Sequence, residues 1–515
     1  MNRVLLLASL ICCVLGSTVH AQQRYLDPIF DEVTMTPNVV YGVNATVLTY
    51  NDPNIGQALA LPQVMDVYTA TNDTETNKPL FLVFHTGNFL PFPVNGGTGG
   101  TKEDSVVVEI CTQLAKRGFV AAAVTYRAGW NPIAATQTER VFGLINAAYR
   151  GVQDANTAVR YFRRTVEEEN NPYNIDPTKI GLWGVGTGGY ISLNTIGLDD
   201  YNKVLIPKFI ADIPNPTGGT LPYPMVQEAV NGDIYGTSVG IVDATYGAVT
   251  GFVPGDTLCY PNHVGYSSDV SMAVNMGGAL GDSTWLDAGQ APIVSFHVPT
   301  DPFAPYECGI VNVPVVNLAV VEACGSKVVG QQQNGFGNTQ QWVDFGFLDD
   351  YSAAANSINE GLEGLMPFER EDPTDSAPWD FYADDNPNAT EPSNPEEARI
   401  YLDSIYNYTI PRACLTMDLG CDLTGYNNTK ETVAAKAVGL TFNPNPSSAS
   451  IFFNTKADSP MLDMVVFDMQ GRMMGSYLNI NTTSFELKRN ELTSGMYYVQ
   501  IRFEEGVTTQ KVIFN

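Results

Sequence analysis

The sequence contains few histidines and few basic residues. Of its 515 residues only four are His, and 27 Lys and Arg stand against 55 Asp and Glu, which gives a formal net charge of −28. A chain this acidic repels phosphate backbones and anionic membrane surfaces. We therefore predict no nucleic-acid partner, and we interpret the acidic surface as one that keeps an exported protein in solution.

Long apolar runs are also absent, except at the amino terminus. Arg3 followed by the apolar stretch 4–15 and a small-residue site ending at Ala21 predicts a signal peptide over residues 1–21, with Gln22 as the first mature residue. A lipoprotein signal at Cys12 is the alternative, but the preceding Ile is large for that motif. No later run approaches the roughly 18 apolar residues that a membrane-spanning helix needs, so we predict no transmembrane segment.

Six cysteines follow the predicted signal peptide, and export favours disulfides among them. Sequence alone leaves 15 connectivities open. Cys414 and Cys421 would close a very short loop and are our first predicted pair, whereas Cys111 suits either a bridge or a small buried apolar side chain. No cysteine pair has the spacing of zinc ligands, and we predict no metal and no cofactor. The six are Cys111, Cys259, Cys308, Cys324, Cys414 and Cys421.

Residues 63–189 alternate strand and helix patterns in the manner of a parallel sheet with helical crossovers. Residues 80–84 are continuously apolar, as a strand covered on both faces requires. Apolar residues between Val152 and Val166 recur at spacings of three and four and predict an amphipathic helix. A strand at 179–183 runs directly into a glycine-rich turn. Further strands are predicted at 271–276, 291–297 and 315–321.

The composition changes after Leu365. Residues 371–397 are rich in Asp, Asn, Pro and Glu and predict an excursion over the surface. A helix at 396–406 and a linker at 426–438 follow. From Leu440 onward the pattern is of strands only, because apolar side chains alternate with polar ones over 497–503, as in a half-buried strand. This end predicts a small β-sandwich.

The carboxyl-terminal motifs, in their order and position, resemble a known sorting module. They are Asn443-Pro444-Asn445-Pro446, Phe467-Asp468-Met469-Gln470-Gly471-Arg472 and Leu492-Thr493-Ser494-Gly495-Met496-Tyr497. Together they resemble the type A carboxyl-terminal sorting domain of the type IX (Por) secretion system of Bacteroidetes, here over 439–515. The resemblance implies the type IX machinery as partner, and release from the cell or attachment to its outer surface. A carbohydrate-binding or adhesive sandwich is the alternative, since such folds serve many functions.

The main body, predicted over 22–425, carries four motifs in a familiar order. They are His85-Thr86-Gly87, Tyr126-Arg127, the helix Asp154 to Arg160, and Gly184-Val185-Gly186-Thr187-Gly188-Gly189. These resemble the His-Gly-Gly, Tyr-Arg, Asp-x-x-x-Ala-x-Arg and Gly-x-Ser-x-Gly-Gly motifs of carboxylesterase-like α/β-hydrolases. The resemblance implies a doubly wound, mostly parallel α/β sheet, and it places Asp301 where such enzymes carry their acid.

Two members of the expected triad are missing. Gly186 stands where the family has its nucleophilic serine, and no acyl-enzyme can form without a side-chain oxygen. Thr187 is one residue out of phase, where the elbow offers a backbone N–H instead. The family order also requires a histidine after Asp301, and none follows. Glu363 is the residue we assign to the region of the missing base, although a carboxylate is a poor substitute at neutral pH.

The pocket itself is predicted to persist. The N–H groups of Gly87 and Thr187, beside His85, form an oxyanion-type site that would hold part of a small molecule or glycan. His85 at a strand end also suits a purely structural, hydrogen-bonded role. Our first hypothesis is therefore a surface-delivered pseudo-hydrolase that binds or supports rather than catalyses. The second is an active hydrolase that uses Glu363 or Asp301 as base.

Overall fold

The computed structural model describes residues 22–215, 218–313, 317–372, 374–427, 435–468, 473–477, 480–489, 492–503 and 506–515. The predicted signal peptide and the central part of the predicted linker lie outside these residues. The chain divides into two compact units, one of residues up to 345 with 350–422, and one of 346–349 with 423–515. Each is described separately.

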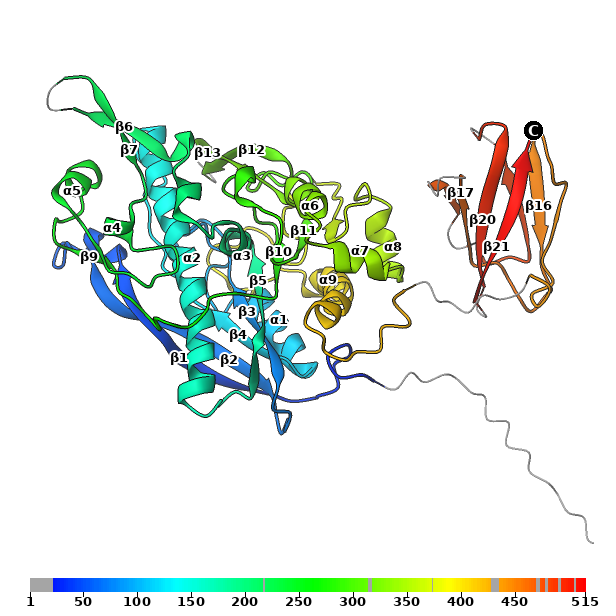
Figure 1. Ribbon diagram of the computed structural model, residues 1–515, viewed down its shortest axis with the longest axis horizontal. Coiled ribbons are helices and arrows are strands. Elements are labelled where there is room, and N and C mark those ends of the chain that lie inside the picture. The colour runs from blue at the N-terminus through cyan, green and yellow to red at the C-terminus, as the bar shows by residue number, and fades with distance from the viewer. Residues whose placement is uncertain are drawn as a thin grey trace, which may run out of the picture. The chain divides into compact units, whose positions relative to one another are not determined.

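An eight-stranded sheet forms the centre of the first unit, in the order β1-β2-β4-β3-β5-β10-β11-β14 (Figure 1). All neighbours from β4 to β14 are parallel, whereas β1 and β2 pair antiparallel with each other and β2 pairs antiparallel with β4. This is the mostly parallel α/β-hydrolase-like sheet that the sequence predicted. The strands are β1 (Val33–Thr46), β2 (Leu59–Ala70), β3 (Lys78–Phe84), β4 (Val120–Val124), β5 (Ile175–Val185), β10 (Met272–Met276), β11 (Ile293–His297) and β14 (Leu365–Pro367).

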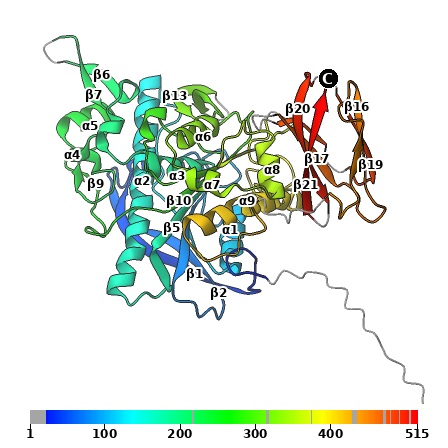
Figure 2. The same ribbon diagram turned by 45° about the vertical axis from the view of Figure 1, so that its right-hand side comes forward.

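Strand β3 shows why the sheet is doubly wound. All seven of its residues are buried, and they alternate between two apolar environments. Leu80, Leu82 and Phe84 belong to the same core as the helix α2 (Gln137–Glu168). Phe81 points the other way and meets Trp183 edge to face at 5.7 Å between ring centres, and Trp183 lies 6.2 Å from a tyrosine of α9 (Pro395–Thr416). Helices therefore cover both faces of the sheet (Figure 2).

Helix α2 is longer than its sequence pattern predicted. It begins at a capping box, in which Thr136 accepts from the backbone of Glu139 and the Glu139 side chain accepts in return. Within it, Asp154 accepts hydrogen bonds from both the backbone N–H and the guanidinium of Arg127, at 2.7 and 2.8 Å. Both side chains are buried, so the Tyr-Arg and Asp motifs recognised in the sequence join the end of β4 to α2 by a buried ion pair.

Other helices and short hairpins complete this unit. Helix α1 (Ser105–Lys116) follows β3, and α3 (Thr187–Gly197) follows β5. The sequence predicted a strand at 315–321, which overlaps β13, but it did not predict β12 or the hairpins β6–β7 and β8–β9. The remaining elements are β6 (Ile210–Pro214), β7 (Thr220–Pro224), α4 (Glu228–Asn231), β8 (Gly240–Ile241), α5 (Ala244–Thr250), β9 (Thr257–Cys259), β12 (Cys308–Val313), β13 (Leu318–Cys324), α6 (Ser326–Gly335), α7 (Gln340–Phe345) and α8 (Asp350–Asn356).

The second unit is the predicted β-sandwich. A three-stranded sheet, β15-β16-β19, and a four-stranded sheet, β18-β17-β20-β21, share one apolar core. The alternation over 497–503 is confirmed, because Tyr497, Val499, Ile501 and Phe503 are all buried in that core. The strands are β15 (Thr441–Asn443), β16 (Ser450–Asn454), β17 (Asp463–Phe467), β18 (Met473–Tyr477), β19 (Ser484–Lys488), β20 (Gly495–Phe503) and β21 (Gly506–Phe514).

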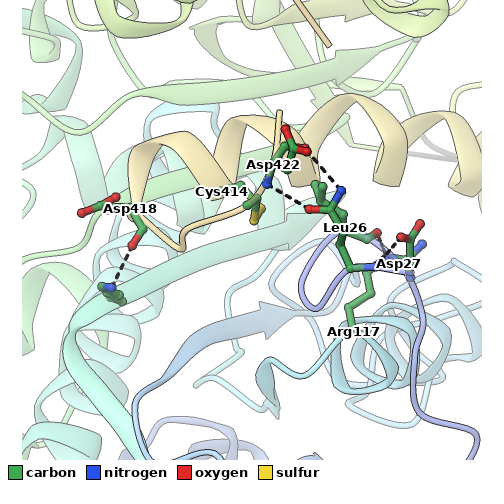
Figure 3. Close-up of a disulfide and its surroundings, with 9 residues drawn as sticks. Leu26, Asp27, Arg117, Cys414, Asp418 and Asp422 are labelled. Atoms are coloured by element: carbon green, nitrogen blue, oxygen red, sulfur yellow. Dashed lines mark hydrogen bonds between the residues drawn. A yellow bond between two sulfur atoms is a disulfide. The ribbon is translucent and has the colours of Figure 1, made fainter. Parts of the chain in front are cut away.

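Two disulfides lie in the first unit. Cys414–Cys421, the predicted pair, closes the loop after α9, and the same loop holds the amino-terminal segment, since the Asp422 N–H donates to the side chain of Gln23 at 2.9 Å (Figure 3). Cys308–Cys324 links directly opposed residues of the β12–β13 hairpin. Cys111 is a free, buried thiol, so its apolar alternative is the correct one.

The thiol count gives a direct prediction. We expect native protein to leave Cys111 and Cys259 unreacted with a maleimide, because both are buried, and unfolded, unreduced protein to react at these two sites only. Peptide mapping without reductant should recover the two linked pairs. Each bridge closes a short loop and is expected to contribute about 3 kcal/mol of stability. Labelling at Cys308 or Cys414 before reduction would contradict the assignment.

Across the residues described, no helix combines the length and apolarity needed to cross a bilayer.

Candidate functional site

Gly186 occupies the turn between β5 and α3. Its backbone has φ 54° and ψ −112°, a conformation that L side chains rarely adopt, and its N–H donates to the Met276 carbonyl at 2.7 Å. A strained strand-to-helix turn of this kind is the nucleophile elbow of α/β-hydrolases. The turn at Gly186 therefore has a backbone of this kind, and the residue at its centre has no side chain.

Thr86 fills the space in which a nucleophile would stand. A Cβ placed on Gly186 would lie 3.0 Å from the Thr86 Cβ and closer still to the Thr86 hydroxyl oxygen. Side-chain carbons do not approach one another so closely in folded proteins, so one of the two residues would have to move. Thr86 replaces the first glycine of the family's His-Gly-Gly motif. That departure is visible in the sequence, but only the structure shows that it blocks the nucleophile position.

The side chain of Thr187, a residue of the predicted oxyanion site, contacts the loop after β3. The Thr187 hydroxyl accepts a hydrogen bond from the Asn88 N–H at 2.7 Å, so the helix residue and the loop after β3 bind each other. Thr187 and Asn88 line the cavity described below, whereas Gly87 and His85 are not among its lining residues. His85 stacks on Tyr126 at 4.4 Å and its Nδ1 donates to the Thr86 carbonyl. Burial lowers the pKa of His85 to about 4, in keeping with a neutral structural histidine.

Asp301 lies in the loop after β11, at the edge of the same cavity. Its Oδ1 accepts the N–H groups of Phe303 and Ala304 at 2.7 and 3.1 Å. Burial raises the pKa of this carboxyl to about 7. His297 lies nearby, with its Nε2 3.8 Å from Asp301 Oδ2, but that nitrogen donates to the Ala304 carbonyl at 3.0 Å. The pair therefore has no catalytic hydrogen bond.

The structure places Glu363 away from the cavity. Its carboxylate forms a buried ion pair with Arg412 at 2.6 Å, and it does not line the cavity. Trp379 lies beside Asp301 instead. A Cβ atom placed on Gly277 would lie 3.2 Å from the Trp379 ring and 3.8 Å from Asp301 Oδ2. The base of a triad must hydrogen-bond its acid. Of these two residues, Trp379 lies beside Asp301 and Glu363 does not.

These residues surround a cavity of about 290 Å³ at the carboxyl ends of the strands. Ligands of open α/β sheets bind at this edge. The lining is mainly apolar and aromatic, with side chains from α2, α3 and the β12–β13 hairpin. Its apolar members include Phe89, Trp130, Leu144, Val152, Phe209 and Trp285.

Residues 371–397, predicted as a surface excursion, cover part of this cavity. Trp379 is buried and lines it together with Asp380. Asn386 and Asn388 donate to the carbonyls of Thr98 and Gly97, each at 2.6 Å, and so hold the segment against the loop after β3. The sequence analysis predicted a surface excursion because the segment is mostly acidic and polar. Its one buried tryptophan, Trp379, packs into the cavity. Among the described residues, no group of three or more His, Cys, Asp or Glu is placed to hold a metal ion.

Asp301 should make stability depend on pH. Burial raises its pKa in the folded chain from the ordinary 3.8 to about 7, so the folded state binds the proton more tightly and the free energy of unfolding falls as pH rises from about 4 to about 7. The loss is about 1.4 kcal/mol per unit of pKa difference. We expect Asp301→Asn to gain stability relative to the natural protein between pH 4 and pH 8.

The measurement is the urea midpoint of both proteins at several pH values. Glu167→Gln, at the exposed end of α2, is the matched control and should leave the pH dependence unchanged. If Asp301→Asn and the natural protein ran parallel across this pH range, Asp301 would be shown to ionise normally.

Comparison with known proteins supports the interpretation of the second unit. Residues 441–515 match the family described as the secretion system C-terminal sorting domain. No curated protein matches the chain. Among solved structures, it is similar to esterase 2 of Thermogutta terrifontis (16% identity over 65% of this chain and 82% of the esterase, TM-score 0.30) and to a bifunctional GH43-CE protein of Bacteroides eggerthii (12% identity over 53% and 29%, TM-score 0.27).

Proposed function

We propose that this protein is an exported, non-catalytic relative of the esterase-like α/β-hydrolases that binds a small apolar molecule in the cavity above the elbow. The observation that carries the proposal is the position of Thr86, whose side chain stands where the side chain of a nucleophile at Gly186 would have to be. An elbow without a nucleophile, and without room for one, supports binding rather than acyl transfer.

The other triad positions support the same conclusion. The residue beside Asp301 is Trp379, which offers one N–H donor and cannot accept a proton. Triad members act as a unit, so the loss of one removes most of the catalysis. Here Gly186 offers no nucleophile, Thr86 occupies the space of its side chain, and the residue beside Asp301, Trp379, is not a base. These three features lie in different segments of the chain.

The C-terminal sorting domain indicates that the protein is secreted. We infer that the type IX machinery receives this second unit after the signal peptide has directed the chain across the inner membrane, and that the protein ends on or outside the cell surface. The first unit would then meet its ligand outside the cell.

An apolar small molecule fits the cavity better than a glycan. Small-molecule pockets are usually concave, mainly apolar and a few hundred Å³ in volume, as this one is. A glycan presents many hydroxyl groups, each of which needs a polar partner when it is buried. Polar side chains, among them Thr86, Asn88 and Asn194, are a minority of the lining.

Binding of a neutral apolar fluorophore, N-phenyl-1-naphthylamine, tests the proposal. We expect saturable binding that weakens about tenfold or more in Ala148→Phe, because this substitution on α2 places a ring inside the cavity. Glu167→Phe, at the exposed end of the same helix, is the matched control and should bind as the natural protein does. Equal binding by all three proteins would show that the fluorophore occupies another surface, and would overturn the proposal.

Asp301 favours a second candidate function. A carboxyl with a pKa of about 7 in a cavity can act as a general base on water at neutral pH, so hydrolysis without a nucleophile is chemically feasible. Such an enzyme would hydrolyse nitrophenyl esters and would lose that activity in Asp301→Asn. If the natural protein has no such activity, this candidate is excluded for those esters.

A further inference from the structure

The charge of the cavity is one-sided. Asp301 and Asp380 both line it, and none of the described lining residues is Lys, Arg or His. Burial raises the pKa of both carboxyls to about 7, and for Asp380 the charge of Asp104 adds to the effect. At pH 8 both are ionised, and the lining carries negative charge without a cation.

Asp301 leaves one carboxylate oxygen available to a ligand. Oδ1 accepts two backbone N–H groups, whereas Oδ2 has only His297 Nε2 at 3.8 Å, whose proton is directed to a carbonyl. The Asp301 side chain is 3% exposed. Burying a carboxylate without a cationic partner is unfavourable in free energy. A cation that pairs with it offsets much of that unfavourable term.

Trp379 adds a second unmet requirement at the same place. The residue is 1% exposed, it lines the cavity, and its indole N–H has no hydrogen-bond partner among the residues that the structure describes. Its ring and Asp301 Oδ2 lie on the same side of Gly277. A Cβ atom placed on Gly277 would be 3.2 Å from the ring and 3.8 Å from Oδ2. Tyr190, Trp285 and Phe303 also line the cavity, and aromatic rings of this kind attract cations.

We infer that the ligand is an amphiphilic amine: an apolar body in the aromatic part of the cavity, an ammonium group at the Asp301 carboxylate, and a nearby oxygen that accepts from the Trp379 N–H. This inference rests on the proposed binding function and names its ligand class. The apolar body would contact the apolar lining, and the ammonium group would pair with the Asp301 carboxylate. The oxygen would accept the hydrogen bond that the Trp379 N–H can donate.

The same features exclude a fatty acid. A carboxylate ligand would place a second negative charge beside the buried Asp301 carboxylate, and like charges at short range in a poorly solvated site repel strongly. A neutral alcohol with the same chain would gain the apolar contacts but not the ion pair. The three head groups should therefore bind in the order amine, alcohol, acid.

Affinity for the amine should rise with pH between 5 and 8. The groups that face Asp301 are His297, which stays neutral over this range, and Tyr190, whose pKa lies well above it. Asp380 faces Asp104, whose own pKa is raised by burial. Deprotonation of Asp301 and Asp380 is thus the change that dominates, and an alkylammonium keeps its charge throughout.

Displacement of N-phenyl-1-naphthylamine by octylamine, octanol and octanoic acid tests the inference. At pH 8 we expect octylamine to displace the probe at a concentration about tenfold or more below that of octanol, and octanoate to need about tenfold more than octanol. The preference for the amine should shrink at pH 5. Asp301→Asn and Asp380→Asn should each reduce it at pH 8, whereas Glu167→Gln should leave it intact.

The outcomes separate the inference from the function on which it rests. If the probe binds and octylamine is no better than octanol at pH 8, the inference is overturned and the proposed binding function stands. If the probe does not bind, the binding function fails, and the inference with it. The pH dependence of the natural protein keeps the test decisive even if a variant does not fold.

Discussion

A chain that lacks residues 440–515 is expected to fold, to retain its cavity and to accumulate in the periplasm instead of reaching the cell surface. The described strands of this segment form a unit with an apolar core of their own, and they match the sorting-domain family. Because the first unit buries its large sheet between its own helices, the deletion removes little of the core on which the first unit depends.

The measurement is cell fractionation with surface proteolysis in a host that has the type IX system. The matched control is a periplasmic reporter fused to residues 423–515, which should appear on the surface or in the medium. Surface delivery of the truncated chain would contradict the role assigned to this domain. Degradation of the truncated chain in the periplasm would instead show that the two units depend on each other for stability.

The second large effect concerns the elbow. Gly186→Ser alone is expected to leave the protein without activity, because the new side chain collides with Thr86 and has no base. Thr86→Gly with Gly186→Ser should restore the space, and adding Trp379→His should place an imidazole between Asp301 and the serine. We expect weak labelling of the double variant by a fluorophosphonate, and ester hydrolysis about tenfold or more above the natural protein only in the triple variant.

The matched control replaces the third change by Glu363→His. Glu363 is paired with Arg412 outside the cavity, so this variant should hydrolyse esters no faster than the double variant. It should also lose stability, about 3 kcal/mol or more, because it removes the buried ion pair between Glu363 and Arg412. If the triple variant with Glu363→His were active and the one with Trp379→His were not, Glu363 would be the residue at the base position.

Local patterns in the sequence predicted much of the fold. The apolar run of β3, the glycine-rich turn at Gly186 and the alternation of β20 each express contacts that their own segment dictates. The Cys414–Cys421 bridge was predictable for the same reason, since its short loop leaves few alternatives. The hypothesis of a missing nucleophile rests on one position, Gly186, because the elbow motif fixes where a serine would be expected.

The features that escaped prediction depend on contacts between distant segments. Trp379 sits in an acidic, proline-rich stretch, and only the packing of that stretch against the loop after β3 brings the ring beside Asp301. Glu363 was assigned to the base position by its place in the chain, whereas its pairing with Arg412 is set by how α9 packs. The hairpin β12–β13, which lines the cavity, carries no strong turn signal.

Exposure of the purified natural protein to a fluorophosphonate probe, beside an active serine esterase, tests the central claim most directly. We expect no labelling of the natural protein under conditions that label the esterase completely. Gly186 offers no side-chain oxygen, and Thr86 fills the space that a side chain at position 186 would need. Stoichiometric labelling that maps to Thr187, or to any serine of the cavity, would contradict it.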